Sequence, residues 1–151
     1  MSTYTVETNG DVALATGTAK SILSVICAAN SPVKLIEIGV GFDGISGTAE
    51  PVTVELCSST EATAGTATSH TIAQTGGVPR AAQASGKRNF TVEPTVLTVL
   101  KRWLVHPQSG MVLQFPLGRE PMQTTTSDAL VLRCTAPAGV NVQAYMEFEE
   151  G

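Results

Sequence analysis

Charged and aromatic side chains are scarce in this sequence. Asp, Glu, Lys and Arg make up 15% of the 151 residues, against a usual share of about 25%, and aromatic residues make up 5%. The formal net charge is −4, and the longest runs of basic residues are the pairs Lys87–Arg88 and Lys101–Arg102. We therefore expect no nucleic-acid partner, because a phosphate-binding groove needs clustered basic charge.

Long apolar segments and secretion signals are also missing. No apolar run reaches the length of about 18 residues that indicates a membrane-spanning helix. Residues 1–7 lack the basic and then apolar pattern of a signal peptide. We therefore expect a protein that is made in the cytoplasm and has no membrane partner.

Cysteine and histidine are too few and too dispersed to indicate a metal site. Cys27, Cys57 and Cys134 lie far apart among apolar residues, and no C-x-x-C pair is present. They are typical of buried, reduced thiols and not of zinc ligands. His70 and His106 each lack the closely spaced second histidine of a metal site, so we expect no metal and no cofactor.

The main pattern in the sequence is a series of short segments in which apolar and polar residues alternate. A period of two places one side of each segment in a core. In the strand expected at 33–42, the core face should hold Ile36, Ile38, Val40 and Phe42. In the next strand, Val52, Val54 and Leu56 should point inward. In the strand expected at 129–135, one face should hold Leu130, Leu132 and Cys134. The segments with strand character are 20–29, 33–42, 51–57, 96–105, 111–115, 129–135 and 140–149.

This pattern indicates an all-β fold. Eight to ten strands separated by Gly, Pro, Asn and Asp turns predict an antiparallel β-sandwich, with a jelly-roll-like arrangement favoured. An immunoglobulin-like sandwich is the alternative, although its Cys–Trp–Cys spacing is absent. The length suits one domain, which we place at residues 20–151. Residues 1–19 are expected to form an N-terminal arm or edge strand, with 1–16 contacting a neighbouring subunit or a partner surface.

The sequence predicts the form of two connections between strands. Residues 96–105 and 111–115 alternate on either side of a turn at 106–110, which predicts a hairpin. The stretch from Ser58 to Arg88 is rich in small polar residues, and it predicts a long surface excursion with one strand near 69–74. Long connections in compact domains frequently contact partners, so we expect this excursion to do so.

The segment from Gly39 to Gly44 matches the pattern G-x-G-x-x-G. A dinucleotide site needs this loop to open a helix whose N-terminus meets the pyrophosphate. Gly47 and Pro51 follow and disfavour a helix, so no nucleotide is expected. The glycines are interpreted as strand positions that face a close neighbour.

No grouping of residues indicates catalysis. A G-x-S-x-G nucleophile elbow is absent, and neither histidine has a recognisable partner. Glu37 and Glu55 lie on neighbouring strand-like segments, and three more carboxylates crowd the C-terminus. Paired carboxylates can hydrolyse glycosides, but these are interpreted as solvated outer-face charges. We therefore expect no catalytic residue and no enzyme activity. The C-terminal carboxylates are Glu147, Glu149 and Glu150.

Trp103 is the only tryptophan and stands beside Lys101 and Arg102. A core position is the favoured interpretation. A docking hot spot or an aromatic platform for a sugar is the alternative.

Several stretches together resemble capsid decoration (cement) proteins of tailed bacteriophages. The resemblance covers about residues 20–150 and is structural, not catalytic. It implies a jelly-roll body, commonly trimeric, that binds the major capsid protein and stabilises the head shell on the virion surface. The low-charge surface, well suited to being covered by a neighbour, agrees with this. The stretches are 35–44, 51–57, 100–107, 114–121 and 136–142.

Two other functions remain open from the sequence. One is another phage assembly component, such as a fibre or tail subunit. The other is a carbohydrate-binding jelly-roll module for host attachment, in which Trp103 would provide the platform for the sugar.

Overall fold

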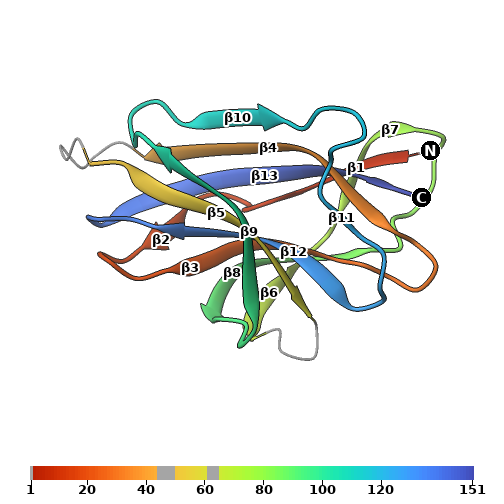
Figure 1. Ribbon diagram of the computed structural model, residues 1–151, viewed down its shortest axis with the longest axis horizontal. Coiled ribbons are helices and arrows are strands. Elements are labelled where there is room, and N and C mark those ends of the chain that lie inside the picture. Colours follow the sequence, from red (N-terminus) through yellow and green to blue (C-terminus); the bar gives the residue numbers. More distant parts are fainter. Residues whose placement is uncertain (1, 44–49, 61–64) are drawn as a thin grey trace.

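The computed structural model describes residues 2–43, 50–60 and 65–151, which form strands joined by turns and loops. Two antiparallel sheets pack face to face, which confirms the predicted β-sandwich (Figure 1). Both ends of the chain lie at the same end of the sandwich. Among the described residues, no helix is long and apolar enough to cross a bilayer.

Sheet 1 is built around the two longest strands. Its order is β10 (Met111–Gln114), β4 (Val33–Asp43), β13 (Val140–Glu150), β1 (Ser2–Glu7) and β7 (Ala73–Gly77), while β11 (Met122–Gln123) pairs with β4 and β2 (Val12–Leu14) pairs with β13.

Sheet 2 has one unbranched order. It is β6 (Thr66–His70), β8 (Ser85–Val92), β3 (Lys20–Ile26), β12 (Asp128–Thr135), β5 (Val52–Thr60) and β9 (Leu97–Val105). The described part thus has more strands than the eight to ten expected, because several are too short to show an alternation.

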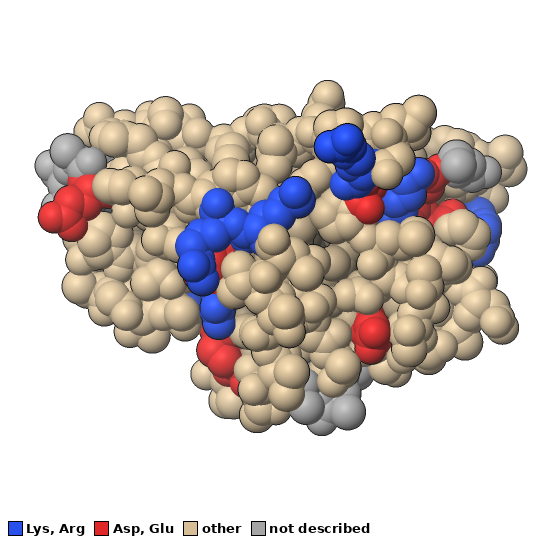
Figure 2. All heavy atoms as spheres, in the orientation of Figure 1, with Lys and Arg blue, Asp and Glu red and all other residues tan. Residues whose placement is uncertain are grey.

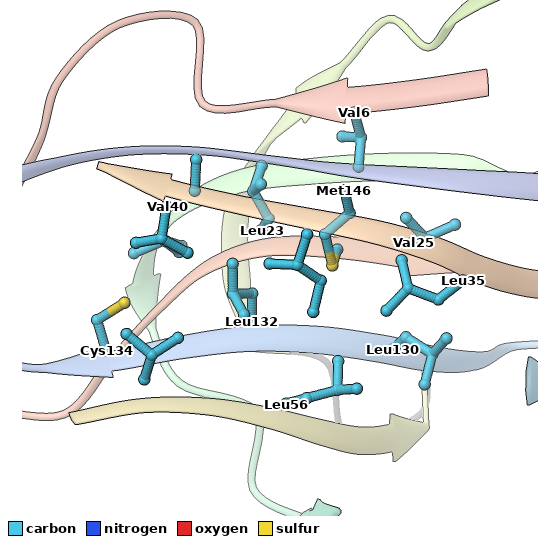
Figure 3. Packing of buried hydrophobic residues seen from close by; sticks show 14 of the residues in the cluster. Val6, Leu23, Val25, Leu35, Val40, Leu56, Leu130, Leu132, Cys134 and Met146 are labelled. Carbon is cyan, nitrogen blue, oxygen red and sulfur yellow. The ribbon is translucent and has the colours of Figure 1, made fainter. Parts of the chain in front are cut away.

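The core lies between the sheets, with side chains from both layers meeting there (Figure 3). The inward faces predicted for β5 and β12 are confirmed, since each of the predicted side chains is at most 1% exposed. Alternation explains this, because successive residues of a strand point to opposite faces. These side chains are Val52, Val54, Leu56, Leu130, Leu132 and Cys134.

The face predicted for β4 is partly wrong, because the strand contains a bulge. β13 pairs Glu147 with Glu37 but pairs Phe148 with Leu35, so Ile36 has no partner on this side. A bulge shifts the alternation by one residue. Leu35 and Ile38 therefore both point into the core, and Ile36 is only half-buried.

The predicted hairpin between 96–105 and 111–115 is wrong. β9 pairs with β5 in sheet 2, whereas β10 pairs with β4 in sheet 1. The turn between them crosses from one layer to the other. It is closed by hydrogen bonds from the amides of Ser109 and Gly110 to the carbonyl of His106, with Gly110 at a φ of 69°.

The N-terminal segment differs from the arm or edge strand that the sequence suggests. β1 lies inside sheet 1, paired with β13 on one side and β7 on the other. Tyr4 and Val6 are 1% and 0% exposed and belong to the core. Residues 2–7 are therefore part of the sandwich.

The stretch from Ser58 to Arg88 is more structured than expected. It contains β6 and β7, which belong to different sheets, and the start of β8. The chain changes sheets between His70 and Ala73, inside the single strand predicted at 69–74, so that prediction is wrong.

A strap, defined here as residues 93–96, crosses the outer face of sheet 2 from β8 to β9. The Glu93 carboxylate accepts a 2.5 Å hydrogen bond from the Ser21 amide, and the Ser59 hydroxyl donates one of 2.8 Å to the Val96 carbonyl. A second apolar cluster lies on this face, and Pro94 of the strap is buried. Its buried members are Ile26, Cys57, Ala129 and Val131.

Candidate functional site

A groove runs over the outer face of sheet 1, and we call it the outer groove. Its floor is β4 at Gly39 and Gly41, which alternate with the core residue Val40 and therefore point outward. β13 forms one wall with Gln143 and Tyr145. The space measures about 470 Å³ and continues into a second hollow of about 410 Å³ that shares Gly41 and Gln143.

Glycine shapes this floor in two different ways. A Cβ at Gly39 would overlap the ring of Tyr145, so the ring occupies the space that a side chain would fill. A Cβ at Gly41 would meet nothing within 4 Å, and the groove is open there. The prediction that the glycines of the G-x-G-x-x-G segment face a close neighbour is therefore confirmed for Gly39 and wrong for Gly41, and Gly44 lies outside the described residues.

Glu37, which lies two residues before Gly39 on the same outer face of β4, holds the Tyr145 ring in place. The Tyr145 hydroxyl donates a hydrogen bond to Oε1 of Glu37, and Nε2 of Gln114 donates one of 2.6 Å to Oε2. These two hydrogen bonds lower the pKa of the Glu37 carboxyl. The same contact raises the pKa of Tyr145 to about 12, so the hydroxyl remains a donor at neutral pH.

The second hollow adds further carboxylates. It is lined by Asp11, Phe42 and Asp43, together with the shared Gly41 and Gln143. Gln143 donates a 2.6 Å hydrogen bond from Nε2 to Oδ1 of Asp11, which holds the amide between the two hollows. The described residues that line either hollow include no lysine or arginine.

The opposite sheet carries a compact ion-pair group on its outer face. Oε1 of Glu55 accepts a 2.9 Å hydrogen bond from Nε of Arg102, and Oε2 accepts one of 2.8 Å from Nε of Arg133. Figure 2 shows basic side chains enclosing a small acidic patch over β5 and β9. Burial alone would raise the pKa of Glu55, but Arg133 and Arg102 outweigh it and lower that pKa.

Two of the carboxylates expected on solvated outer faces are buried instead. Glu55 is 7% exposed and Glu150 is 1% exposed, so the expectation is wrong for both. Glu150 accepts hydrogen bonds from the amides of Gln83 and Ala84, at 2.9 and 2.5 Å, which replace water as partners. Glu37 and Glu55 lie on strands of opposite sheets, so they do not form a carboxylate pair.

β9 forms an edge of sheet 2, since it pairs only with β5 among the described strands. Its Leu100 and Leu104 side chains are 46% and 71% exposed. Trp103 is half-buried and packs against the core without belonging to its buried members, so the favoured core position is confirmed in part. Sequence reasoning missed the β9 edge, because alternation alone does not show which strands lack a partner.

The histidines and cysteines line neither the outer groove nor the ion-pair group, although His70 contacts Glu7, a lining residue of the groove. His70 is 3.9 Å from Glu7, and His106 accepts a backbone hydrogen bond within its turn. All three cysteines are buried free thiols, as predicted. Burial raises the pKa of Cys57 to about 11 and that of Cys134 to about 12. The part of the chain that the structure describes holds no group of three or more His, Cys, Asp or Glu arranged for a metal ion.

Comparisons of this chain with protein-family models, curated proteins and solved structures found no match.

Proposed function

We propose that this chain is a virion structural protein that decorates and stabilises the head shell of a tailed bacteriophage. In this proposal it binds the major capsid protein from outside, as a trimer. The sequence resemblance motivates the proposal. The sandwich supports it, because a rigid body with an available strand edge suits docking better than catalysis.

The observation that carries the proposal is the β9 edge. A strand edge presents unpaired backbone donors and acceptors to another chain, and natural proteins ordinarily cover or blunt such edges. β9 is nine residues long and exposes Leu100 and Leu104. An extended segment that adds to such an edge gains main-chain hydrogen bonds, with side-chain contacts that give specificity.

The ion-pair group makes this edge suitable for docking. Glu55 on β5 links Arg102 of the edge strand to Arg133 of β12, so three adjacent strands are tied together. A docking surface that is already ordered loses less conformational entropy on binding. In a trimer, three such edges would act together through effective concentration, even where each contact is weak.

The first experiment measures the mass of the purified protein by light scattering and its binding to purified expanded and immature shells of the encoding phage. We expect a trimer that sediments with expanded shells. Leu104→Asp should weaken shell binding at least about tenfold, the loss of about 1.4 kcal/mol. Leu117→Asp is the matched control, because Leu117 is 90% exposed but lies outside β9.

Two results would overturn this proposal. Absence of shell binding by a folded protein excludes decoration. Equal effects of the two aspartate variants exclude the β9 edge as the contact. Binding to tails instead of heads would support the fibre or tail alternative. The carbohydrate alternative depends on Trp103, which is half-buried against the core, and a glycan array tests that alternative directly.

A further inference from the structure

We propose that the outer groove receives a lysine or arginine side chain from an extended segment of the protein to which this chain docks. This inference rests on the proposed function only in requiring a protein partner. It concerns sheet 1, whereas the β9 edge belongs to sheet 2. The two contacts can therefore be tested separately.

The shape of the groove admits a long, narrow side chain. Two glycines on β4 leave its floor without side chains, and Gly41 has open space above it. The Tyr145 ring lies beside this opening and is fixed by Glu37. A hollow of about 470 Å³ on the outer face of the sheet has room for a side chain inserted from a segment that lies across it.

The charge of the groove favours a cation. Glu7 lines the first hollow, and Asp11 and Asp43 line the second. A cleft lined by one sign of charge concentrates ligands of the other sign. Among the described residues, His70 of β6 contacts this lining, with its Nε2 3.9 Å from Oε1 of Glu7.

The strands of sheet 1 as a whole also carry more carboxylates than basic residues. Its strands contain six carboxylates and one lysine, whereas the strands of sheet 2 contain six basic residues and two carboxylates. The sheet 1 residues are Glu7, Glu37, Asp43, Glu147, Glu149 and Glu150 against Lys34, and the sheet 2 residues are Lys20, Lys87, Arg88, Lys101, Arg102 and Arg133 against Glu55 and Asp128.

The rim of the groove distinguishes a basic side chain from a small inorganic cation. β10 contributes Met111 and Val112, and Val112 is 68% exposed. Lysine and arginine have apolar stems that pack on such surfaces while the charged head reaches polar groups. A guanidinium or ammonium group over the face of Tyr145 would gain a cation–π contact as well.

The test uses an acetylated, amidated Ala-Arg-Ala-Arg-Ala peptide and its citrulline counterpart, which has the same shape without the charge. Binding is followed by isothermal titration and by amide NMR shifts. We expect the arginine peptide to bind with a Kd of about 1 mM or tighter at low salt, and more weakly as salt rises. Shifts should centre on Gly39, Gly41 and Gln143, and the citrulline peptide should bind at least about tenfold more weakly.

Two variants and a control locate the site. Gly41→Val fills the open part of the floor without altering charge, and Asp43→Asn removes one carboxylate. Each should weaken arginine-peptide binding at least about threefold. Glu149→Gln is the control, since it removes a carboxylate from the same face at the other end of β13. Circular dichroism and melting temperature establish that each variant is folded.

The outcomes separate this inference from the proposed function. No arginine-peptide binding at low salt overturns the groove, and so does equal binding of the citrulline peptide or an unchanged affinity in Gly41→Val. If shells still bind under any of these results, the decoration proposal stands alone. If the peptide binds in the groove but shells do not bind, the groove stands and the decoration proposal falls.

Discussion

The ring of Tyr145 occupies the space that a side chain at Gly39 would fill. The two residues are directly paired across β13 and β4, so the glycine and the ring form one packing unit. The hydroxyl of that ring reaches Glu37 on β4. This small unit defines one wall of the outer groove, and it predicts that Gly39 and Gly41, two residues apart in one strand, differ in tolerance to substitution.

Replacing Gly39 with alanine should therefore destabilise the protein, whereas Gly41→Ala should not. A Cβ at Gly39 forces the Tyr145 ring away, at a cost of about 1–3 kcal/mol for overpacking. At Gly41 the space is open, and restricting the unfolded chain should leave stability unchanged or raise it by about 0.5 kcal/mol. Urea unfolding measures both variants, and equal free energies of unfolding would contradict this account.

Tyr145 should lose its hydroxyl proton at a higher pH than free tyrosine, because Glu37 accepts a hydrogen bond from that hydroxyl. The folded pKa of about 12 lies above the ordinary value of about 10. The stability from this contact is therefore complete below about pH 10 and is lost as the pH rises toward 12. Ultraviolet absorbance of tyrosinate follows the titration, with Tyr145→Phe identifying the step. Glu37→Gln should lower the midpoint, and an unchanged midpoint would show that Glu37 is not its cause.

Much of the fold could be predicted from alternation, but strand pairing could not. Alternation identifies which side of β9 and β10 is apolar, and it cannot show that a five-residue turn crosses between sheets about 10 Å apart. The bulge at Ile36 is invisible for the same reason, because it depends on the register with β13. Glu55 looks like a solvated carboxylate in the sequence, since its partners Arg102 and Arg133 are 47 and 78 residues away.

Removing the Glu55 carboxylate should cost more stability than removing a carboxylate whose basic partner keeps a second carboxylate. Glu55→Gln leaves Arg102 and Arg133 without their counter-charge, and we expect a loss of about 1–3 kcal/mol in urea unfolding. Glu149→Gln is the comparison, because Lys34 keeps Glu120 at 3.4 Å, and it should cost less than about 1 kcal/mol. Similar losses in the two variants would show that Glu55 contributes only as a surface charge.

The contribution of Glu55 to the free energy of unfolding should also depend on pH. Because its folded pKa is lowered, the stability it provides is present above the ordinary glutamate pKa of about 4.3 and is lost as the pH falls through the folded pKa. The difference in unfolding free energy between the native sequence and Glu55→Gln should therefore shrink below about pH 4.3. A difference that stays constant down to pH 2 would assign it to packing and not to charge.

The three cysteines should be unreactive while the protein is folded. Cys57 and Cys134 are 0% exposed and have raised thiol pKa values of about 11 and 12, so few thiolates exist near pH 8. Cys27 is 2% exposed, with its Sγ 3.2 Å from the Ser31 carbonyl. An aromatic disulfide reagent should label all three only after urea unfolds the chain. Rapid labelling of even one native thiol would contradict the burial described here.

The N-terminal strand β1, which the sequence suggests as an arm, lies inside sheet 1 in the structure. Tyr4 stacks on Phe148 with ring centroids 5.7 Å apart, and its hydroxyl donates a 3.1 Å hydrogen bond to the Arg80 carbonyl. Tyr4→Ala should cost about 3–5 kcal/mol, because it leaves a large cavity. Thr3→Ala is the control, since Thr3 is only half-buried and points away from the core.

Removing residues 1–7 should have a still larger effect than Tyr4→Ala. The deletion takes Tyr4 and Val6 out of the core and leaves β13 and β7 without the strand between them. We expect the shortened chain to be unfolded or to melt far below the full-length protein in circular dichroism. An arm would behave in the opposite way, since losing it would leave the melting temperature unchanged and reduce only subunit or shell contacts. The melting temperature of the shortened chain thus distinguishes a structural strand from an arm before any partner is involved.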